Sequence, residues 1–169
     1  MDAPDLLAVR RAALSAGVLV ARVTQPYRVK GRRTPAPVAQ LDDAWITVVS
    51  TLRADATPLV VGGRSSGARV ACRTARALGA AGVVALAFPL HPPGKAADPT
   101  RSRAAELATG LPTLVVNGDR DPFGVPAPGP DVEVCVRPGE RHDLRRDPAA
   151  VGTAVVAWLA HHGWAAPSS

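Results

Sequence analysis

Cysteine is scarce in this sequence of 169 residues, which contains only Cys72 and Cys135. The two cysteines lie far apart and form neither a CxxC pair nor a spacing with histidine that is typical of zinc sites. The sequence therefore gives no reason to expect a disulfide framework, a metal or an organic cofactor. Each cysteine lies in an apolar segment, so we expect both to be reduced thiols packed in the interior.

Long apolar runs are also missing, and none approaches the roughly 18 residues that a membrane-spanning helix needs. The first residues, Met-Asp-Ala-Pro-Asp, are acidic where a secretory signal peptide would be basic. We therefore expect a soluble, cytoplasmic protein that does not bind membranes. The length is that of one ordinary domain, which we assign to residues 1–164, followed by a loose tail at residues 165–169.

Lysine and aromatic residues are few, whereas arginine is abundant. The sequence has 20 Lys and Arg residues against 14 Asp and Glu, a formal net charge of +6, yet its only lysines are Lys30 and Lys95. Arginine use of this kind, beside many Ala, Pro, Gly and Val residues, is typical of a GC-rich coding sequence. Tyr27 is the one aromatic residue beside a basic cluster. Nucleic-acid binding, which uses clustered cations and stacking aromatics, is therefore not the expected function.

What the sequence does contain is an alternation of two kinds of segment. Short, continuously apolar segments have the composition of buried strands, and segments with apolar residues at helical spacing alternate with them. The expected strands are residues 18–23, 58–62, 82–88, 113–117 and 132–136, and the expected helices are residues 5–16, 38–52, 65–78, 101–109 and 147–162. This alternation predicts an α/β fold, a three-layer sandwich with a mostly parallel five-stranded sheet. Ligands of such sheets bind beyond the carboxyl ends of the strands, so we expect the chemistry in the loops there.

One of these loops, Gly63-Arg64-Ser65-Ser66-Gly67, fits the pattern G-x-S-x-G. Between a strand and a helix, this pattern makes a tight reversal that projects the middle hydroxyl above the sheet. Ser65 is therefore a candidate nucleophile. A serine before a helix also commonly caps the first turn of that helix, and this alternative remains open.

A serine nucleophile needs a base, and the base needs an acid that orients it. His161 and His162 close the last expected helix, where a capping or dipole role is expected. His91 and His142 lie in loops that follow the carboxyl ends of expected strands. Two acids, Asp119 and Asp121, follow the fourth expected strand, and with either of them His142 completes the chain order serine, acid, histidine. His91 does not fit that order.

Four segments carry a resemblance to a known family. They are Gly-Gly-Arg-Ser-Ser-Gly-Ala-Arg at residues 62–69, Phe-Pro-Leu-His-Pro-Pro-Gly-Lys at 88–95, Asn-Gly-Asp-Arg-Asp-Pro-Phe-Gly at 117–124 and Gly-Glu-Arg-His-Asp-Leu at 139–144. With them the sequence resembles the α/β-hydrolase superfamily. Within it, the sequence resembles the dienelactone-hydrolase-related group, which includes bacterial hydrolase-like proteins and the hydrolase-like subunit of the NSL histone-acetyltransferase complex.

The resemblance implies a role for each candidate. Ser65 would be the nucleophile, His142 the general base and Asp121 the acid, with Asp119 as the alternative acid. Ser66 stands where relatives usually carry methionine, and its backbone N–H would donate to the oxyanion.

Basic residues are expected around this site. The set is Arg28, Lys30, Arg32, Arg33, Arg64, Arg120 and Arg141. It suggests a small anionic acyl substrate, although a solvated arginine surface is the alternative. Arg64, His91 and Arg120 are the candidates for binding this substrate. For His91 and Lys95 in His-Pro-Pro-Gly-Lys, the favoured alternative is that they only shape a rigid loop.

Two features of the family are not found before Asp5. In the family fold a further strand lies between the first two strands of this chain, and it leads to a Gly-rich loop that donates a second oxyanion N–H. We therefore expect the true start of the coding sequence to lie upstream of Met1. Without that strand its neighbours keep unpaired edges, and without the second donor turnover falls by about 10²- to 10³-fold.

The leading hypothesis is a serine hydrolase of ester, lactone or thioester bonds that forms an acyl-enzyme. The alternative is a non-catalytic hydrolase-like module that binds a partner. An anion-binding flavodoxin-like domain ranks last, because the sequence has no glycine-rich phosphate loop at a helix N-terminus.

Overall fold

The computed structural model describes residues 3–32, 34–53, 57–92, 94 and 98–166. Some residues named above lie outside the described residues. They are Met1, Asp2, Arg33, Pro93, Lys95 and the last three residues of the expected tail.

The sheet has four parallel strands, which lie side by side in the order β1-β2-β3-β4. The strands are β1 (Val60–Arg64), β2 (Gly82–Leu86), β3 (Thr113–Gly118) and β4 (Val132–Arg137). All four coincide with expected strands to within a few residues. The parallel sheet confirms the predicted fold class, with four strands where five were expected.

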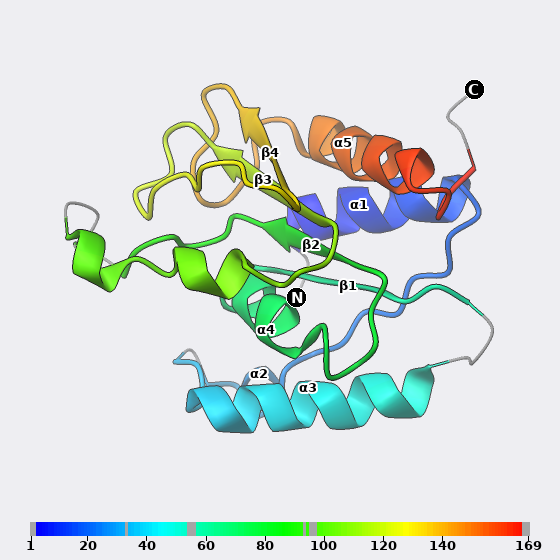
Figure 1. Ribbon diagram of the computed structural model, residues 1–169, viewed down its shortest axis with the longest axis horizontal. Helices are drawn as coiled ribbons and strands as arrows, with labels where there is room; N and C mark the ends of the chain where they lie inside the picture. The colour runs from blue at the N-terminus through cyan, green and yellow to red at the C-terminus, as the bar shows by residue number, and fades with distance from the viewer. Residues whose placement is uncertain (1–2, 33, 54–56, 93, 95–97, 167–169) are drawn as a thin grey trace.

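Helices cover both faces of the sheet and make three layers, as Figure 1 shows. On one face lie α1 (Pro4–Ser15) and α5 (Pro148–His161), and on the other lie α3 (Val38–Leu52) and α4 (Ser66–Thr74). Shorter elements are α2 (Pro26–Val29) and the two 3₁₀ turns η1 (Pro99–Arg101) and η2 (Ala104–Leu107). None of the helices in the described ranges is long and apolar enough to cross a membrane.

The two central strands are buried along their whole length, because both of their faces are covered. Every residue of β2 and β3 is buried. Val83 and Val115 point into the core beneath α4, whereas Leu86 and Val116 point into the core beneath α5. Such burial on both faces explains why these strands are continuously apolar in the sequence.

The prediction of a strand at residues 18–23 is wrong. Among the described residues no strand pairs with this segment, and the side chain of Leu19 is 93% exposed. The β-branched composition favours extended backbone, but a strand also needs a neighbour with which to share its hydrogen bonds. The segment instead runs as an extended connection from the α1 layer to the α3 layer (Figure 1).

The prediction of a helix at residues 101–109 is also wrong, because this region forms only 3₁₀ turns. Hydrogen bonds to a distant loop replace those within a helix. The Arg103 N–H donates to the Leu90 carbonyl at 2.8 Å, and the Arg103 guanidinium donates to the Pro89 carbonyl at 3.1 Å.

The last described residues pack against the rest of the domain, whereas a loose tail was expected from residue 165. Trp164 makes an edge-to-face contact with Trp158, with ring centroids 5.4 Å apart. Beyond it, the Ala166 N–H donates to the Ala16 carbonyl at 3.0 Å. Within the expected tail, residues 165 and 166 are thus attached to the α1 and α5 layer.

Candidate active site

The turn between β1 and α4 holds Ser65 in a strained conformation. The backbone of Ser65 has φ +55° and ψ −116°, a region that residues with a side chain rarely adopt. The chain reverses so tightly that a Cβ placed on Gly63 would lie 2.4 Å from the carbonyl carbon of Gly67. Glycine is therefore required at position 63. The Ser65 N–H donates to the Leu86 carbonyl at 2.9 Å, which ties the turn to β2.

The Ser65 hydroxyl does not cap α4. Ser65 occupies the N-cap position, yet its side chain makes no capping hydrogen bond. Its Oγ instead lies 2.9 Å from Nε2 of His142, a residue 77 positions away in the sequence. The capping alternative for the side chain is therefore wrong.

The His142 ring connects Ser65 with a buried carboxylate. Its Nδ1 lies 2.8 Å from Oδ2 of Asp121, whose side chain is fully buried. Because a carboxylate can only accept, Nδ1 carries the hydrogen, and this leaves Nε2 to accept from the Ser65 hydroxyl. The three side chains form one continuous hydrogen-bonded chain.

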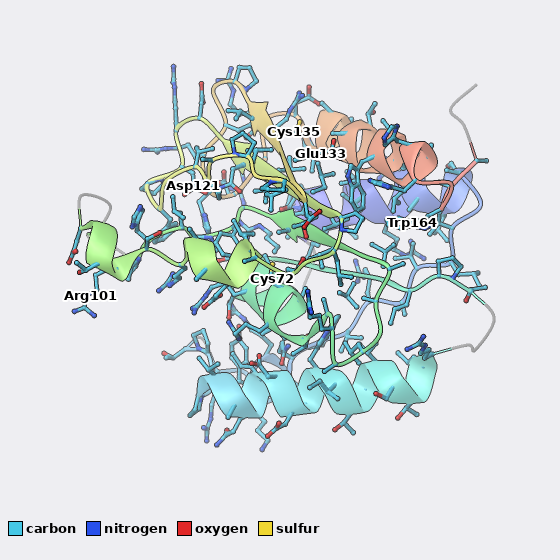
Figure 2. All side chains as sticks on the ribbon, viewed as in Figure 1. Cys72, Arg101, Asp121, Glu133, Cys135 and Trp164 are labelled. Atoms are coloured by element: carbon cyan, nitrogen blue, oxygen red, sulfur yellow. The ribbon has the colours of Figure 1, made fainter. Side chains whose placement is uncertain are left out.

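Phe123 fixes both the Asp121 carboxylate and the His142 ring. Its N–H donates to Asp121 Oδ1 at 2.9 Å, and its ring makes an edge-to-face contact with the His142 ring, with centroids 4.4 Å apart. Figure 2 shows Asp121 at one end of the sheet, opposite the end that carries Trp164. This is the end at which the strands finish, as expected for a ligand site in a parallel sheet.

Asn117 is a buried residue of this site that the sequence analysis missed. Its side-chain oxygen accepts the Phe88 N–H at 2.8 Å, and its side-chain nitrogen donates to the carbonyls of Phe88 at 3.0 Å and Gly124 at 3.2 Å. Asn117 thus joins the end of β2 to the loop that carries Asp121. A polar residue at the end of an otherwise apolar strand was the available signal.

Asp119 lies apart from the histidine ring. Its side chain is exposed and its Oδ1 accepts the Gly139 N–H at 2.7 Å. The carboxylate therefore holds the start of the 139–146 loop, and Asp121 is the acid that faces His142.

The turn around His142 is itself fixed by buried groups. Leu144 is fully buried and has φ +45°, an unusual conformation for leucine, and its N–H donates to the Arg141 carbonyl at 3.1 Å. The buried Glu140 carboxylate accepts the backbone N–H groups of Arg146 at 3.2 Å and Asp147 at 2.7 Å. These contacts hold the backbone on both sides of His142.

A family model that describes the α/β hydrolase domain matches residues 1–134 of the sequence. The chain belongs to the α/β-hydrolase family. No curated protein sequence matches it. The narrower resemblance to the dienelactone-hydrolase-related group, and to the NSL subunit within it, remains a prediction.

Solved α/β hydrolases share the fold at low sequence identity. An α/β serine hydrolase without a lid from Xanthomonas campestris is 20% identical with a TM-score of 0.74, covering 100% of this chain and 77% of its own. A serine hydrolase homologue from Coxiella burnetii is 18% identical with a TM-score of 0.65, and the match covers 92% of this chain and 77% of the homologue. A structure from a study of two metagenome-derived lipolytic enzymes is 15% identical with a TM-score of 0.64, and the match covers 94% of this chain and 89% of that structure's chain.

In this α/β-hydrolase fold the three expected substrate-binding residues have different surroundings. Arg64 forms an ion pair with Asp5 at 2.9 Å and donates to the His142 carbonyl at 2.9 Å. The His91 N–H donates to the Phe123 carbonyl at 2.9 Å, which places the His91 loop beside the Asp121 loop. Arg120 is exposed, and its N–H donates to the Glu140 carbonyl at 2.9 Å.

A basic cavity of about 420 Å³ lies beside the His142 turn. Its lining residues are Arg120, Gly139, Glu140, Arg141, Asp143, Arg145 and Arg146. Ser65 and His142 do not line it, although Arg141 and Asp143 flank His142 in the sequence. Two members of the expected basic rim, Arg120 and Arg141, therefore meet two further arginines here.

Neither cysteine takes part in this site. Cys72 is buried on α4, and burial raises the pKa of its thiol to about 12, with the Glu106 charge acting in the same direction. Within the described ranges, no group of three or more His, Cys, Asp or Glu side chains could hold a metal ion.

Proposed function

We propose that this α/β-hydrolase is a serine hydrolase of carboxylic ester, lactone or thioester bonds, with Ser65, His142 and Asp121 as its catalytic residues. The observation that carries the proposal is the hydrogen-bonded chain from the Ser65 hydroxyl through the His142 ring to the buried Asp121 carboxylate. The strained backbone of Ser65 supports it, since such strain is typical of the nucleophile turn in this fold.

The first half of the reaction forms an acyl-enzyme. As Ser65 Oγ attacks the substrate carbonyl carbon, His142 Nε2 accepts the hydroxyl proton. Asp121 accepts the hydrogen bond of Nδ1 and stabilises the imidazolium that results. The Ser66 N–H lies in the first turn of α4, where backbone N–H groups have no helical partner, so it can donate to the oxyanion.

The first half ends when His142 donates its proton to the departing oxygen or sulfur and the substrate bond breaks, which leaves Ser65 acylated. The second half releases the acyl group. The neutral ring then accepts a proton from a water molecule, whose oxygen attacks the acyl carbon. The carboxylic acid leaves, and Ser65 recovers its proton from His142.

The choice of acyl substrates rests on the chemistry of the site and on its relatives. Ser65 and His142 provide a nucleophile and a base, and one solved neighbour comes from work on lipolytic enzymes. The resemblance to dienelactone hydrolases points in the same direction and favours small substrates over long lipids.

We also propose that the substrate is anionic. Four arginines, Arg120, Arg141, Arg145 and Arg146, line the cavity beside His142, and only Asp143 and the buried Glu140 oppose their charge within that lining. Guanidinium groups match the planar geometry of carboxylate and phosphate groups.

Hydrolysis of short p-nitrophenyl esters tests the assignment of Ser65. We expect Ser65→Ala to lower the rate by at least about 10³-fold, because no other group replaces the nucleophile. Ser50→Ala, on the exposed face of α3, is the matched control and should retain the wild-type rate. A folded Ser65→Ala protein that hydrolyses esters at the wild-type rate would refute the proposal. A folded wild-type protein without activity toward any acyl ester would favour the non-catalytic binding module.

A further inference from the structure

The residue before the candidate nucleophile makes a bridge that the function described so far does not use. Arg64 is the last residue of β1, and its guanidinium contacts two other parts of the chain. Its Nε lies 2.9 Å from Oδ2 of Asp5 on α1, and its Nη2 donates to the backbone carbonyl of His142 at 2.9 Å. The contact with Asp5 is an ion pair without hydrogen-bond geometry, and the contact with His142 is a hydrogen bond. One planar guanidinium makes both contacts, so it links α1 to the His142 backbone.

Asp5 depends on this bridge. Its side chain is fully buried, and burial raises the pKa of its carboxyl group, whereas the Arg64 charge opposes that rise. A buried carboxylate needs a partner of opposite charge, and Arg64 is the cation placed beside it. Asp5 also lies in the first turn of α1, where the helix dipole favours a negative charge.

Asp5 has a second effect, which concerns His142. A lone guanidinium beside a general base would disfavour the imidazolium that forms during proton transfer. Because the Asp5 carboxylate neutralises Arg64, the pair can hold the histidine backbone while adding little net charge near the ring.

The bridge also fixes a distance that the chemistry needs. Arg64 is covalently joined to Ser65 and hydrogen-bonded to the backbone of His142, so it constrains both ends of the contact between Ser65 Oγ and His142 Nε2. Displacement of a reacting group by about 1 Å can lower an enzymatic rate about 10²-fold.

We propose that Arg64 is a positioning residue that, neutralised by the buried Asp5 of α1, holds His142 at hydrogen-bonding distance from Ser65. This assignment replaces the expected role of Arg64 in substrate binding, because its Nε–Nη2 edge already contacts Asp5 and His142. It rests on the proposed hydrolase function for its kinetic consequences but not for its geometry.

Kinetics of Arg64→Met and Arg64→Lys on a neutral short-chain ester test the proposal. We expect Arg64→Met to lower kcat at least about 10-fold with KM changed less than about twofold, because positioning acts on the chemical step. Lysine keeps the charge but not the two-pronged edge, so Arg64→Lys should recover only part of the loss. Arg11→Gln removes an exposed arginine from α1 and is the matched control. A rise in KM at unchanged kcat would overturn the proposal in favour of substrate binding.

A double-mutant cycle tests the role of Asp5. We expect Asp5→Asn to lower kcat, and the double variant Asp5→Asn with Arg64→Met to be no slower than Arg64→Met alone, since both act through one bridge. Additive losses would contradict this. Thermal unfolding of each variant identifies those that fold, and if Arg64→Met does not fold, Arg64→Lys and Asp5→Asn provide the test.

The proton on His142 Nδ1 gives a readout that needs no activity. Hydrogen-bonded to Asp121, it should give a low-field ¹H NMR signal in the wild type that is lost or broadened in folded Arg64→Met and retained in Arg11→Gln. Retention of a sharp signal in Arg64→Met would overturn the positioning role. If the wild type hydrolyses no ester, the proposed hydrolase function fails while this measurement still decides the role of Arg64.

Discussion

At position 121 a fully buried carboxylate contacts the histidine ring, whereas two residues earlier an exposed carboxylate holds a loop. The sequence left Asp119 and Asp121 open as alternatives, since both follow the same strand. Because their surroundings differ, we expect replacement of the carboxylate by an amide to have a large effect on the rate at position 121 and a small effect at position 119.

We expect Asp121→Asn to lower the rate of ester hydrolysis by about 10²- to 10⁴-fold, because an amide facing Nδ1 no longer fixes the productive tautomer. Asp119→Asn should change the rate by less than about threefold, since its contact is with the Gly139 backbone. Steady-state kinetics of both variants check this. A larger loss for Asp119→Asn than for Asp121→Asn would show that the acid is misassigned.

The two cysteines should differ sharply in reactivity. Only a thiolate attacks an alkylating reagent, and burial holds the pKa of Cys72 at about 12, so this thiol stays protonated near neutral pH. Cys135 is only partly buried. We expect iodoacetamide at pH 8 to modify Cys135 first and Cys72 only on unfolding, as peptide mass spectrometry can measure. The Cys135→Ser variant should lose the faster reaction, and fast labelling of Cys72 in the folded protein would contradict the account.

At the scale of single residues, the sequence predicted which side chains lie in the loops at the carboxyl ends of the strands. Ser65 and His142 were recognisable because each follows a strand, and the structure places them in contact. Asn117 was missed although its polar side chain at the end of an apolar strand was a local signal, whereas Asp5 was not recognised because its partner Arg64 lies far away in the chain. Nothing in the local pattern around Asp5 distinguishes a buried partner of Arg64 from an ordinary acidic residue in a first helical turn.

Between elements, α1 packs closely on α5 at Gly152. A Cβ placed there would lie 2.9 Å from the Ala8 carbonyl oxygen and 3.2 Å from the Ala12 Cβ, so α1 packs directly on the backbone of α5. The absence of a side chain at position 152 therefore sets the distance between the two helices.

We expect Gly152→Ala to destabilise the protein by about 1–3 kcal/mol despite the better helix propensity of alanine, because α1 must shift to make room. Since α1 carries Asp5, the same variant should also slow ester hydrolysis. Urea unfolding measures the change in the free energy of unfolding. Thr153→Ala, at the next and exposed position of α5, is the control, and an unchanged or raised stability of Gly152→Ala would refute the packing argument.

The sequence predicted helices and strands correctly where the apolar pattern of a segment matches its burial in the structure. It failed where the conformation depends on hydrogen bonds with distant parts of the chain. The limits of α3 match the prediction, and β2 and β3 were recognisable because both of their faces are apolar. Residues 18–23 have the same composition but lack a described neighbour, and strand formation depends on that neighbour. Residues 101–109 have helical spacing, yet the hydrogen bonds of Arg103 to a distant loop determine their conformation.

For the whole molecule, the net charge of +6 and the arginine-lined cavity predict attraction of anionic substrates. We expect kcat/KM for a carboxylated ester to fall by at least about threefold between 50 and 300 mM salt, because screening weakens the attraction. The value for a matched neutral ester should stay nearly constant. Arg145→Gln with Arg146→Gln should reduce the salt dependence of the carboxylated ester, and equal salt dependence of both esters would contradict the proposal of an anionic substrate.

The central claim is that the Ser65 hydroxyl is activated by His142. Its most direct test is reaction of the folded protein with a fluorophosphonate probe, followed by peptide mass spectrometry. The account predicts one label, on Ser65, formed in the wild type and absent from Ser65→Ala, with the labelling rate at least about 10²-fold lower in His142→Ala. A folded wild-type protein that remains unlabelled, or that carries the label on another serine, would contradict it.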